Sequence, residues 1–162
     1  MHLTDGTGPA RSDGALDGRR TAGAEVPTAA SARAHAESVV RARWEAAGRV
    51  PHEQDMIDLL IVVSELVTNA IVHGDGVAGF DVRTTEDGVR LDVHDHSDVI
   101  PEAAHGSGAL PTGYHGSGYG WPLVIRLARD ISVRRRPGGG KTVSVLMPLR
   151  DAPGPALGAA QA

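Results

Sequence analysis

Cysteine is absent from the 162 residues of the sequence, which excludes disulfide bonds and thiolate metal sites within them. Aromatic residues make up only 3%, so a core has to be built from Val, Leu, Ile and Ala. No apolar run approaches the length that spans a membrane, and the N-terminus lacks the hydrophobic segment of a secretory signal. We therefore expect a soluble, cytoplasmic protein that does not contact a membrane.

An excess of positive charge is also lacking. The sequence has 16 Lys and Arg residues against 20 Asp and Glu residues, a formal net charge of −4. This balance gives no overall electrostatic reason to expect direct binding of nucleic acid. The length favours one domain with a real core over two domains of ordinary size.

Both ends of the sequence differ in composition from its middle. Residues 1–26 are rich in Gly, Ala, Asp and Arg and have almost no large apolar side chains, so they cannot bury enough surface to offset the cost of ordering. Residues 150–162 are mostly Ala, Pro and Gly. We predict a disordered tail at each end and a folded domain over residues 27–149.

The stretch 55–74, DMIDLLIVVSELVTNAIVHG, is predicted to be the central helix. Its apolar residues recur at the i, i+3, i+4, i+7 spacing of a helix packed on a core: Met56, Leu59, Leu60, Val63, Leu66, Val67, Ala70 and Ile71. A β-branched run at 61–63 would also fit a strand, but the pattern is too long for one. Pro51 suits the first helical turn, and Gly74 could supply a left-handed residue at the end.

Three polar residues interrupt this apolar helix. Glu65, Asn69 and His73 follow one another at i+4 spacing and form a polar stripe along one side. Burying such groups without hydrogen bonds costs free energy, so either they pair internally or they face a cavity that holds something polar. In the second case, Asn69 offers a hard oxygen ligand to magnesium and Glu65 could orient or deprotonate a nucleophile.

The remaining elements place helices beside paired strands. Asp87-Gly88 marks a hairpin turn, and residues 96–120 form a polar stretch too long for an ordinary connection, which is typical of a functional lid or of disorder. Paired strands separated by helices predict an α+β fold, a two-layer sandwich with helices on one face of a mainly antiparallel sheet. The predicted elements are a helix at 27–48, strands at 79–84 and 89–94, a helix at 122–130, and strands at 131–136 and 142–147.

Three further features could carry chemistry. Asp95 ends a predicted strand, where it could cap a turn or accept a hydrogen bond from the exocyclic amine of adenine. The glycine-rich run from Gly116 to Gly120 precedes a helix, so its backbone could approach an anion. Gly140-Lys141-Thr142 looks like part of a phosphate-binding P-loop, but Arg135 stands where that motif has glycine and a strand follows, so we reject this interpretation.

Taken together, four segments resemble a known superfamily. ELVTNAIVHG, VHDHS, GSGYGWPLV and GKTVSVLMP are similar, in this order, to the motifs of the Bergerat-type (GHKL) ATP-binding superfamily of gyrase, histidine kinases and mismatch-repair ATPases. Within it, the chain resembles the small anti-sigma-factor serine/threonine kinases over residues 29–149. The resemblance implies the Bergerat ATP-binding fold, with ATP and Mg²⁺ as ligands.

The resemblance also implies a role for individual residues. Glu65 would be the catalytic base, Asn69 the magnesium ligand and Asp95 the residue that reads adenine. Gly118 and Gly120 would hold the lid and the phosphates. The implied nucleotide-binding set is completed by His73, Ser97, Gly116 and Thr142, whose hydroxyl would support adenine recognition. Ser97 stands where the superfamily has glycine, and Trp121 and Pro122 replace a small aliphatic pair.

Two functions follow as hypotheses. In the first, the protein is an ATP-dependent serine/threonine kinase that sequesters a sigma factor and phosphorylates an antagonist protein. In the second, it is a non-catalytic binding module gated by ATP. The resemblance further suggests a homodimer.

Overall fold

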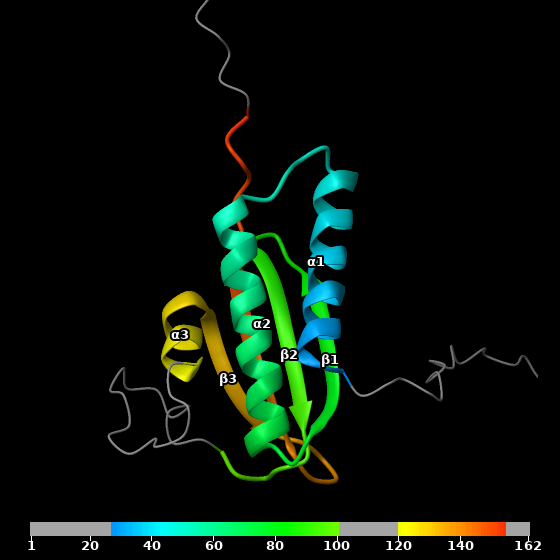
Figure 1. Cartoon of the computed structure of the whole chain (residues 1–162), viewed down its shortest axis with the longest axis vertical. Helices are drawn as coiled ribbons and strands as arrows, with labels where there is room; N and C mark the ends of the chain where they lie inside the picture. The colour runs from blue at the N-terminus through cyan, green and yellow to red at the C-terminus, as the bar shows by residue number, and fades with distance from the viewer. Residues whose placement is uncertain (1–26, 101–119, 155–162) are drawn as a thin grey trace, which may run out of the picture.

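The computed structural model describes residues 27–100 and 120–154, and it confirms the predicted α+β fold. Figure 1 shows α1 and α2 side by side across the sheet, with α3 on the other side of α2, near β3. In chain order the elements are α1 (Ala29–Ala46), α2 (Glu53–His73), β1 (Val77–Thr84), β2 (Gly88–Asp95), α3 (Gly120–Leu127), β3 (Arg129–Arg135) and β4 (Lys141–Pro148).

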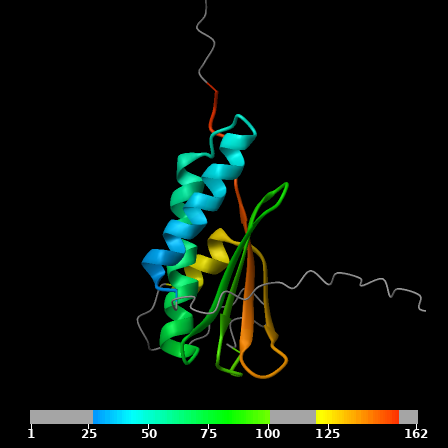
Figure 2. The ribbon, with the colours of Figure 1, turned by 90° about the vertical axis from the view of Figure 1, so that its right-hand side faces the viewer.

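The four strands form one antiparallel sheet in the order β1-β2-β4-β3. Figure 2 shows the helices as a layer on one side of this sheet, so the predicted two-layer sandwich is confirmed. The core lies between the layers and is mostly aliphatic, as the composition required. Its fully buried members include Leu59 and Val63 of α2, Leu91 of β2 and Val145 of β4.

The ends of α2 differ from the prediction in two ways. Pro51 is not in the first turn: it forms an isolated β-bridge with Asp151, and the helix begins at Glu53. Gly74 ends the helix with φ −107°, so it is not the left-handed residue, a role that falls to Asp75 at φ 56°. Gly74 is required for space instead, because a Cβ there would lie 2.6 Å from the carbonyl oxygen of Ala70 and from Oδ2 of Asp95.

The third helix and third strand begin earlier than predicted. α3 starts at Gly120 and ends at Leu127, so residues 129–130 belong to β3 and not to the helix. Asp130 has a positive φ of 47°, and the pairing of β3 with β4 is irregular between Arg129 and Ser132. This bulge lets the strand begin almost directly after the helix.

α2 is long and apolar enough to cross a membrane, judged by length and composition alone. An 18-residue window within its 21 residues has a mean hydropathy of 1.7. The expectation that no apolar run approaches such a length is therefore wrong. The core helix of a soluble protein passes the same test. In this structure 39% of the window is buried, and its buried apolar residues belong to the core between the helices and the sheet, whereas Ile71 and Val72 are exposed.

Ordered contacts extend past Leu149, where the folded domain was expected to end. The Arg150 guanidinium and backbone N–H both bind the buried carboxylate of Asp55, with the guanidinium Nη2 2.6 Å from Oδ1. Asp151 in turn accepts hydrogen bonds from the Trp44 indole and the Arg49 guanidinium. These two residues therefore connect the C-terminal end of β4 to α1 and α2.

The contact between Asp55 and Arg150 predicts a specific loss of acid stability. The Arg150 guanidinium lowers the pKa of Asp55, which outweighs the opposing effect of burial. A carboxyl group with a lowered folded-state pKa stabilises the protein above its unfolded pKa of about 3.9, and this contribution is lost as the pH falls through the folded-state pKa.

We therefore expect Asp55→Asn to lower the free energy of unfolding by about 1 to 2 kcal/mol at pH 7, and by much less near pH 3. Urea unfolding of both proteins at the two pH values measures this difference. Asp58→Asn is the matched control on the same helix, since among the described residues the Asp58 carboxylate accepts an exposed hydrogen bond from Gln54 and acts on Arg150 only weakly, through its charge. An equal loss for Asp55→Asn at both pH values would mean that the ion pair between Asp55 and Arg150 is not the source of the pH-dependent stability.

Candidate functional site

The polar stripe predicted on α2 is present in the structure. Glu65 and Asn69 are half-buried and His73 is exposed, all within the regular part of the helix. The stripe leads to Gly74, nine residues after Glu65, which is about 13 Å along the helix axis. One side of α2 therefore carries polar groups from its middle to its C-terminal end, and the apolar residues that α2 buries in the core lie on a neighbouring side of the helix.

Glu65 lies directly against the first residue of α3. A Cβ on Gly120 would be 2.0 Å from Oε2 of Glu65, so only glycine fits here without displacing the carboxylate. The N-terminal end of a helix carries partial positive charge, which favours a carboxylate beside it. The structure therefore brings together two of the residues predicted for the site, from segments 55 residues apart in the sequence.

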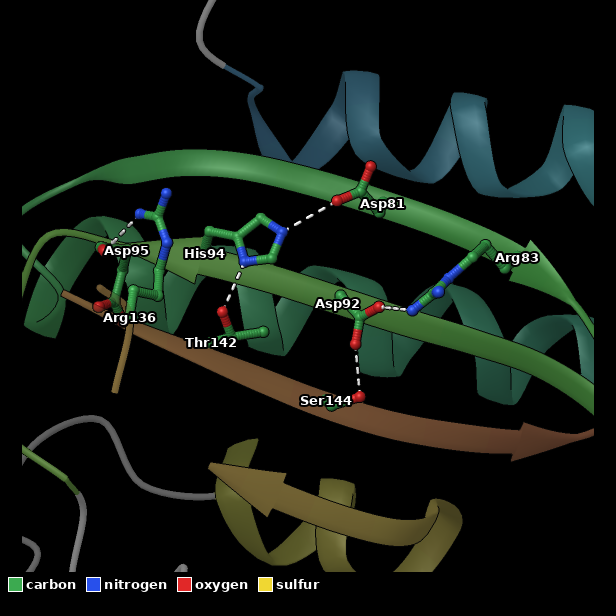
Figure 3. Close-up of polar contacts among 8 residues, drawn as sticks. All are labelled: Asp81, Arg83, Asp92, His94, Asp95, Arg136, Thr142 and Ser144. Carbon is green, nitrogen blue, oxygen red and sulfur yellow. Dashed lines mark hydrogen bonds and ion pairs between the residues drawn. The ribbon is translucent and has the colours of Figure 1, made fainter. Parts of the chain in front are cut away.

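Asp95 is the last residue of β2 and is only 3% exposed. Each oxygen of its carboxylate has one partner: Oδ1 accepts a hydrogen bond from the backbone N–H of Ser97 at 3.1 Å, and Oδ2 lies 2.8 Å from Nζ of Lys141. Arg136 also donates to the backbone carbonyl of Asp95, at 3.4 Å (Figure 3). Asp95 is thus a fixed, buried group that forms a turn through the Ser97 N–H and also pairs with Lys141.

Two glycines allow the chain to approach Asp95 closely. Gly74, at the end of α2, contacts its carboxylate, as described above. Gly140, before β4, has φ +79°, and a Cβ there would lie 2.0 Å from the backbone oxygen of Asp95. The end of α2, the end of β2 and the turn between β3 and β4 therefore meet at this residue.

Lys141 is a site residue that the sequence analysis did not identify. Its side chain is 5% exposed, and its ammonium group binds Asp95 and also donates to the backbone carbonyl of Ser97 at 3.3 Å. As predicted, the Gly140-Lys141-Thr142 segment leads into a strand and not into the helix of a P-loop. The signal that was missed is the strand alternation, which places Lys141 on the same face as Val143 and Val145.

The structure places Thr142 on the other face of the sheet, so its predicted role beside Asp95 has no support in the geometry. Thr142 pairs across the strands with His94, and its hydroxyl lies 2.7 Å from Nδ1 of that ring (Figure 3). The second ring nitrogen, Nε2, lies 2.9 Å from Oδ2 of Asp81 on β1. Neighbouring residues of a strand point to opposite faces, which separates Thr142 from Lys141 and Asp95.

The outer face of the sheet carries a second polar network. Asp92 accepts hydrogen bonds from Ser144 and Arg83 on the two neighbouring strands (Figure 3). Burial raises the pKa of Asp92, but the hydrogen bonds from Ser144 and Arg83 outweigh it, so the pKa is lowered overall. This network holds three strands together on the side away from the helices.

The remaining predicted site residues have different outcomes. Ser97 is buried and holds Asp95 through its backbone, while its hydroxyl accepts from the N–H of Val99 at 3.3 Å. Gly116 and Gly118 lie outside the described residues. Trp121, next to Gly120, is half-buried, and within the described part of the chain its indole N–H is buried without a hydrogen-bond partner.

Among the described residues, no group of three or more His, Cys, Asp or Glu side chains could hold a metal ion. Such a group is not needed for magnesium, which often binds through one or two protein oxygens together with substrate phosphates. The half-buried amide of Asn69, one turn from Glu65, fits this second kind of site.

The close packing around Asp95 can be tested with a pair of glycine variants. We expect Gly140→Ala to lower the free energy of unfolding by about 1 to 3 kcal/mol more than Gly138→Ala, because only the former overpacks the site. Gly138 is a matched control: it has a similar positive φ of +91°, but a Cβ there meets nothing within 4 Å. Chemical denaturation of both variants measures the difference, and equal losses would mean that backbone strain alone requires glycine at 140.

Comparison with known proteins agrees with this geometry. The model of one protein family, the histidine kinase-like ATPase domain, matches residues 27–147, which is most of the chain and nearly all of the predicted domain. Neither a curated protein nor a solved structure gives a significant match. Because the family model covers both layers of the sandwich and the residues around Glu65 and Asp95, the chain belongs to the family of histidine kinase-like ATPase domains.

Proposed function

We propose that this protein is an ATP-dependent serine/threonine kinase of the anti-sigma-factor type. It would regulate transcription by sequestering a sigma factor and phosphorylating a serine on an antagonist protein. The observation that carries the proposal is the position of Glu65, whose carboxylate lies against Gly120 at the start of α3. A candidate base thus stands beside the segment that the family resemblance assigns to the phosphates.

The nucleotide would lie along the polar side of α2. Asp95, at one end of this side, would accept a hydrogen bond from the exocyclic amine of the base. Asn69 would hold magnesium together with phosphate oxygens, and the ion would neutralise charge on the triphosphate. The distance of about 13 Å along α2 between Glu65 and Gly74 suits an extended nucleoside triphosphate.

Glu65 would act on the hydroxyl of the substrate serine. As the serine oxygen forms its bond to the γ-phosphorus, the bond from that phosphorus to the β-phosphate oxygen breaks and ADP leaves. Glu65 takes the proton that the hydroxyl loses. A positioned base of this kind contributes roughly 10²- to 10⁴-fold to a rate.

A non-catalytic module gated by ATP is the second candidate. Trp121 favours it, because a bulky indole with a buried, unpartnered N–H (within the described residues) stands directly after Gly120, beside Glu65. In this scheme ATP occupancy alone switches partner binding, and no phosphate is transferred. Both candidates are proposed to act in the cytoplasm as a homodimer, without direct contact with nucleic acid.

The nucleotide site is tested by calorimetric titration with ATP, with and without magnesium. We expect wild-type binding to depend on magnesium, and Asn69→Ala and Asp95→Ala to weaken it at least tenfold, because each removes a group that contacts the nucleotide or its metal. Thr142→Val, on the opposite face of the sheet, is the control and should bind as the wild type does. No binding at millimolar ATP would refute the proposal.

The catalytic step is tested with Glu65→Gln, which keeps the size of the side chain but not its basicity. We expect ATP affinity within threefold of the wild type and a loss of at least 10²-fold in phosphate transfer to proteins of a cell extract, followed with a γ-thiophosphate analogue of ATP. Glu53→Gln, exposed at the far end of α2, is the matched control. Nucleotide-dependent partner binding with no transfer by the wild type would favour the non-catalytic module.

A further inference from the structure

Lys141 is the only lysine in the sequence, and the other members of its 16 Lys and Arg residues are all arginines. It is also buried, with a side chain 5% exposed, whereas lysine is almost never buried unless it is paired. Its partner is Asp95, the residue proposed to read the nucleotide base. A carboxylate in that role therefore does not stand alone: an ammonium group lies 2.8 Å from one of its oxygens.

The hydrogen bonds of this pair leave capacity for a ligand. A lysine ammonium has three N–H donors. Two of them have partners, Oδ2 of Asp95 and the backbone carbonyl of Ser97, and the third has none among the described residues. Each carboxylate oxygen of Asp95 has one partner and can accept a second hydrogen bond.

The pair therefore presents an acceptor and a donor side by side. A lone carboxylate accepts from the 6-amino group of adenine but repels the 6-carbonyl oxygen of guanine. With the ammonium beside it, adenine can donate its 6-amino group to Asp95 and accept at N1 from Lys141. Guanine can donate N1–H to Asp95 and accept at O6 from Lys141. The flexible four-carbon stem of lysine lets the ammonium serve either arrangement.

We propose that Lys141 is a specificity-determining residue that makes this site accept guanine as well as adenine nucleoside triphosphates. The inference rests on the proposed function, because it assumes that a purine nucleotide contacts Asp95. It predicts that wild-type protein binds GTP and ATP with affinities within about tenfold of each other. It also predicts that the Lys141 side chain contacts both nucleotides directly.

The single lysine allows a measurement on the wild-type protein. Protein labelled with ¹³C at the lysine ε-carbon, and carrying no lysine in a purification tag, gives one lysine signal in an NMR spectrum. We expect this signal to shift on saturation with magnesium-ATP and with magnesium-GTP. The triphosphate of unsubstituted purine riboside, which has no 6-amino group or 6-carbonyl oxygen, should bind at least tenfold more weakly than ATP.

Substitutions provide the second measurement. We expect Lys141→Met to raise the ratio of GTP to ATP dissociation constants at least tenfold. Both bases lose the donor from Lys141, but guanine is then left with its O6 carbonyl beside the Asp95 carboxylate, whereas adenine still donates its 6-amino group to Asp95 and loses only the contact at N1. We expect Lys141→Arg to restore most of the wild-type ratio. Arg134→Met removes an exposed positive charge from the neighbouring strand and should leave the ratio unchanged. If Lys141→Met fails to fold, the labelled wild type still decides the question.

The possible failures are distinct. If the wild type binds ATP but discriminates against GTP more than 100-fold, or if its lysine signal stays in place when ATP saturates the protein, the inference about Lys141 is wrong and the proposed nucleotide site stands. If neither nucleotide binds at millimolar concentration, the proposed function fails, and the inference fails with it.

Discussion

The apolar side of α2 is buried against the sheet, and the positions of the other parts follow from this contact. Leu59 and Val63 of the helix and Leu91 and Val145 of the sheet are completely buried in one core, and each such side chain contributes about 1.5 to 3 kcal/mol through burial. Because α2 cannot rotate without exposing them, its polar stripe is held in one orientation. Glu65 therefore faces the start of α3, and the end of the helix is fixed against Asp95.

Much of this arrangement can be predicted from local patterns in the sequence. The helical spacing of apolar residues over 55–74 predicts α2, and the polar turn at Asp87-Gly88 predicts the β1–β2 hairpin, because both signals arise between near neighbours in the sequence. The ends of elements were predicted less well. Whether Pro51 joins a helix depends on its bridge to Asp151, a hundred residues away, and Gly74 is required by a side chain on another strand. Contacts between residues far apart in the sequence leave no recognisable pattern in the sequence around either residue.

The candidate site also contains residues that local sequence patterns predict and residues that they do not. Glu65 and Asn69 could be found from their spacing on one helix, and Asp95 from its place at the end of a strand. The choice between Lys141 and Thr142 could not be made in this way. The alternation Thr142-Val143-Ser144-Val145 places Lys141 on the face of the two valines, but it does not show which residues of other strands lie on that face. Only the pairing of β4 with β2 shows that Lys141 shares a face with Asp95.

The buried pair of Asp95 and Lys141 is difficult to explain by stability alone. Removing two charges from water is costly, and a buried ion pair can often be replaced by apolar residues of similar volume with no loss of stability. An apolar pair would therefore fill the space between Gly74 and Gly140 equally well. What it would not provide is an acceptor beside a donor, held by the backbone of Ser97 at the end of a polar helix face. That combination is useful for recognising the edge of a purine, and this is the strongest physical argument that the end of α2 is a binding site and not merely a junction of the fold.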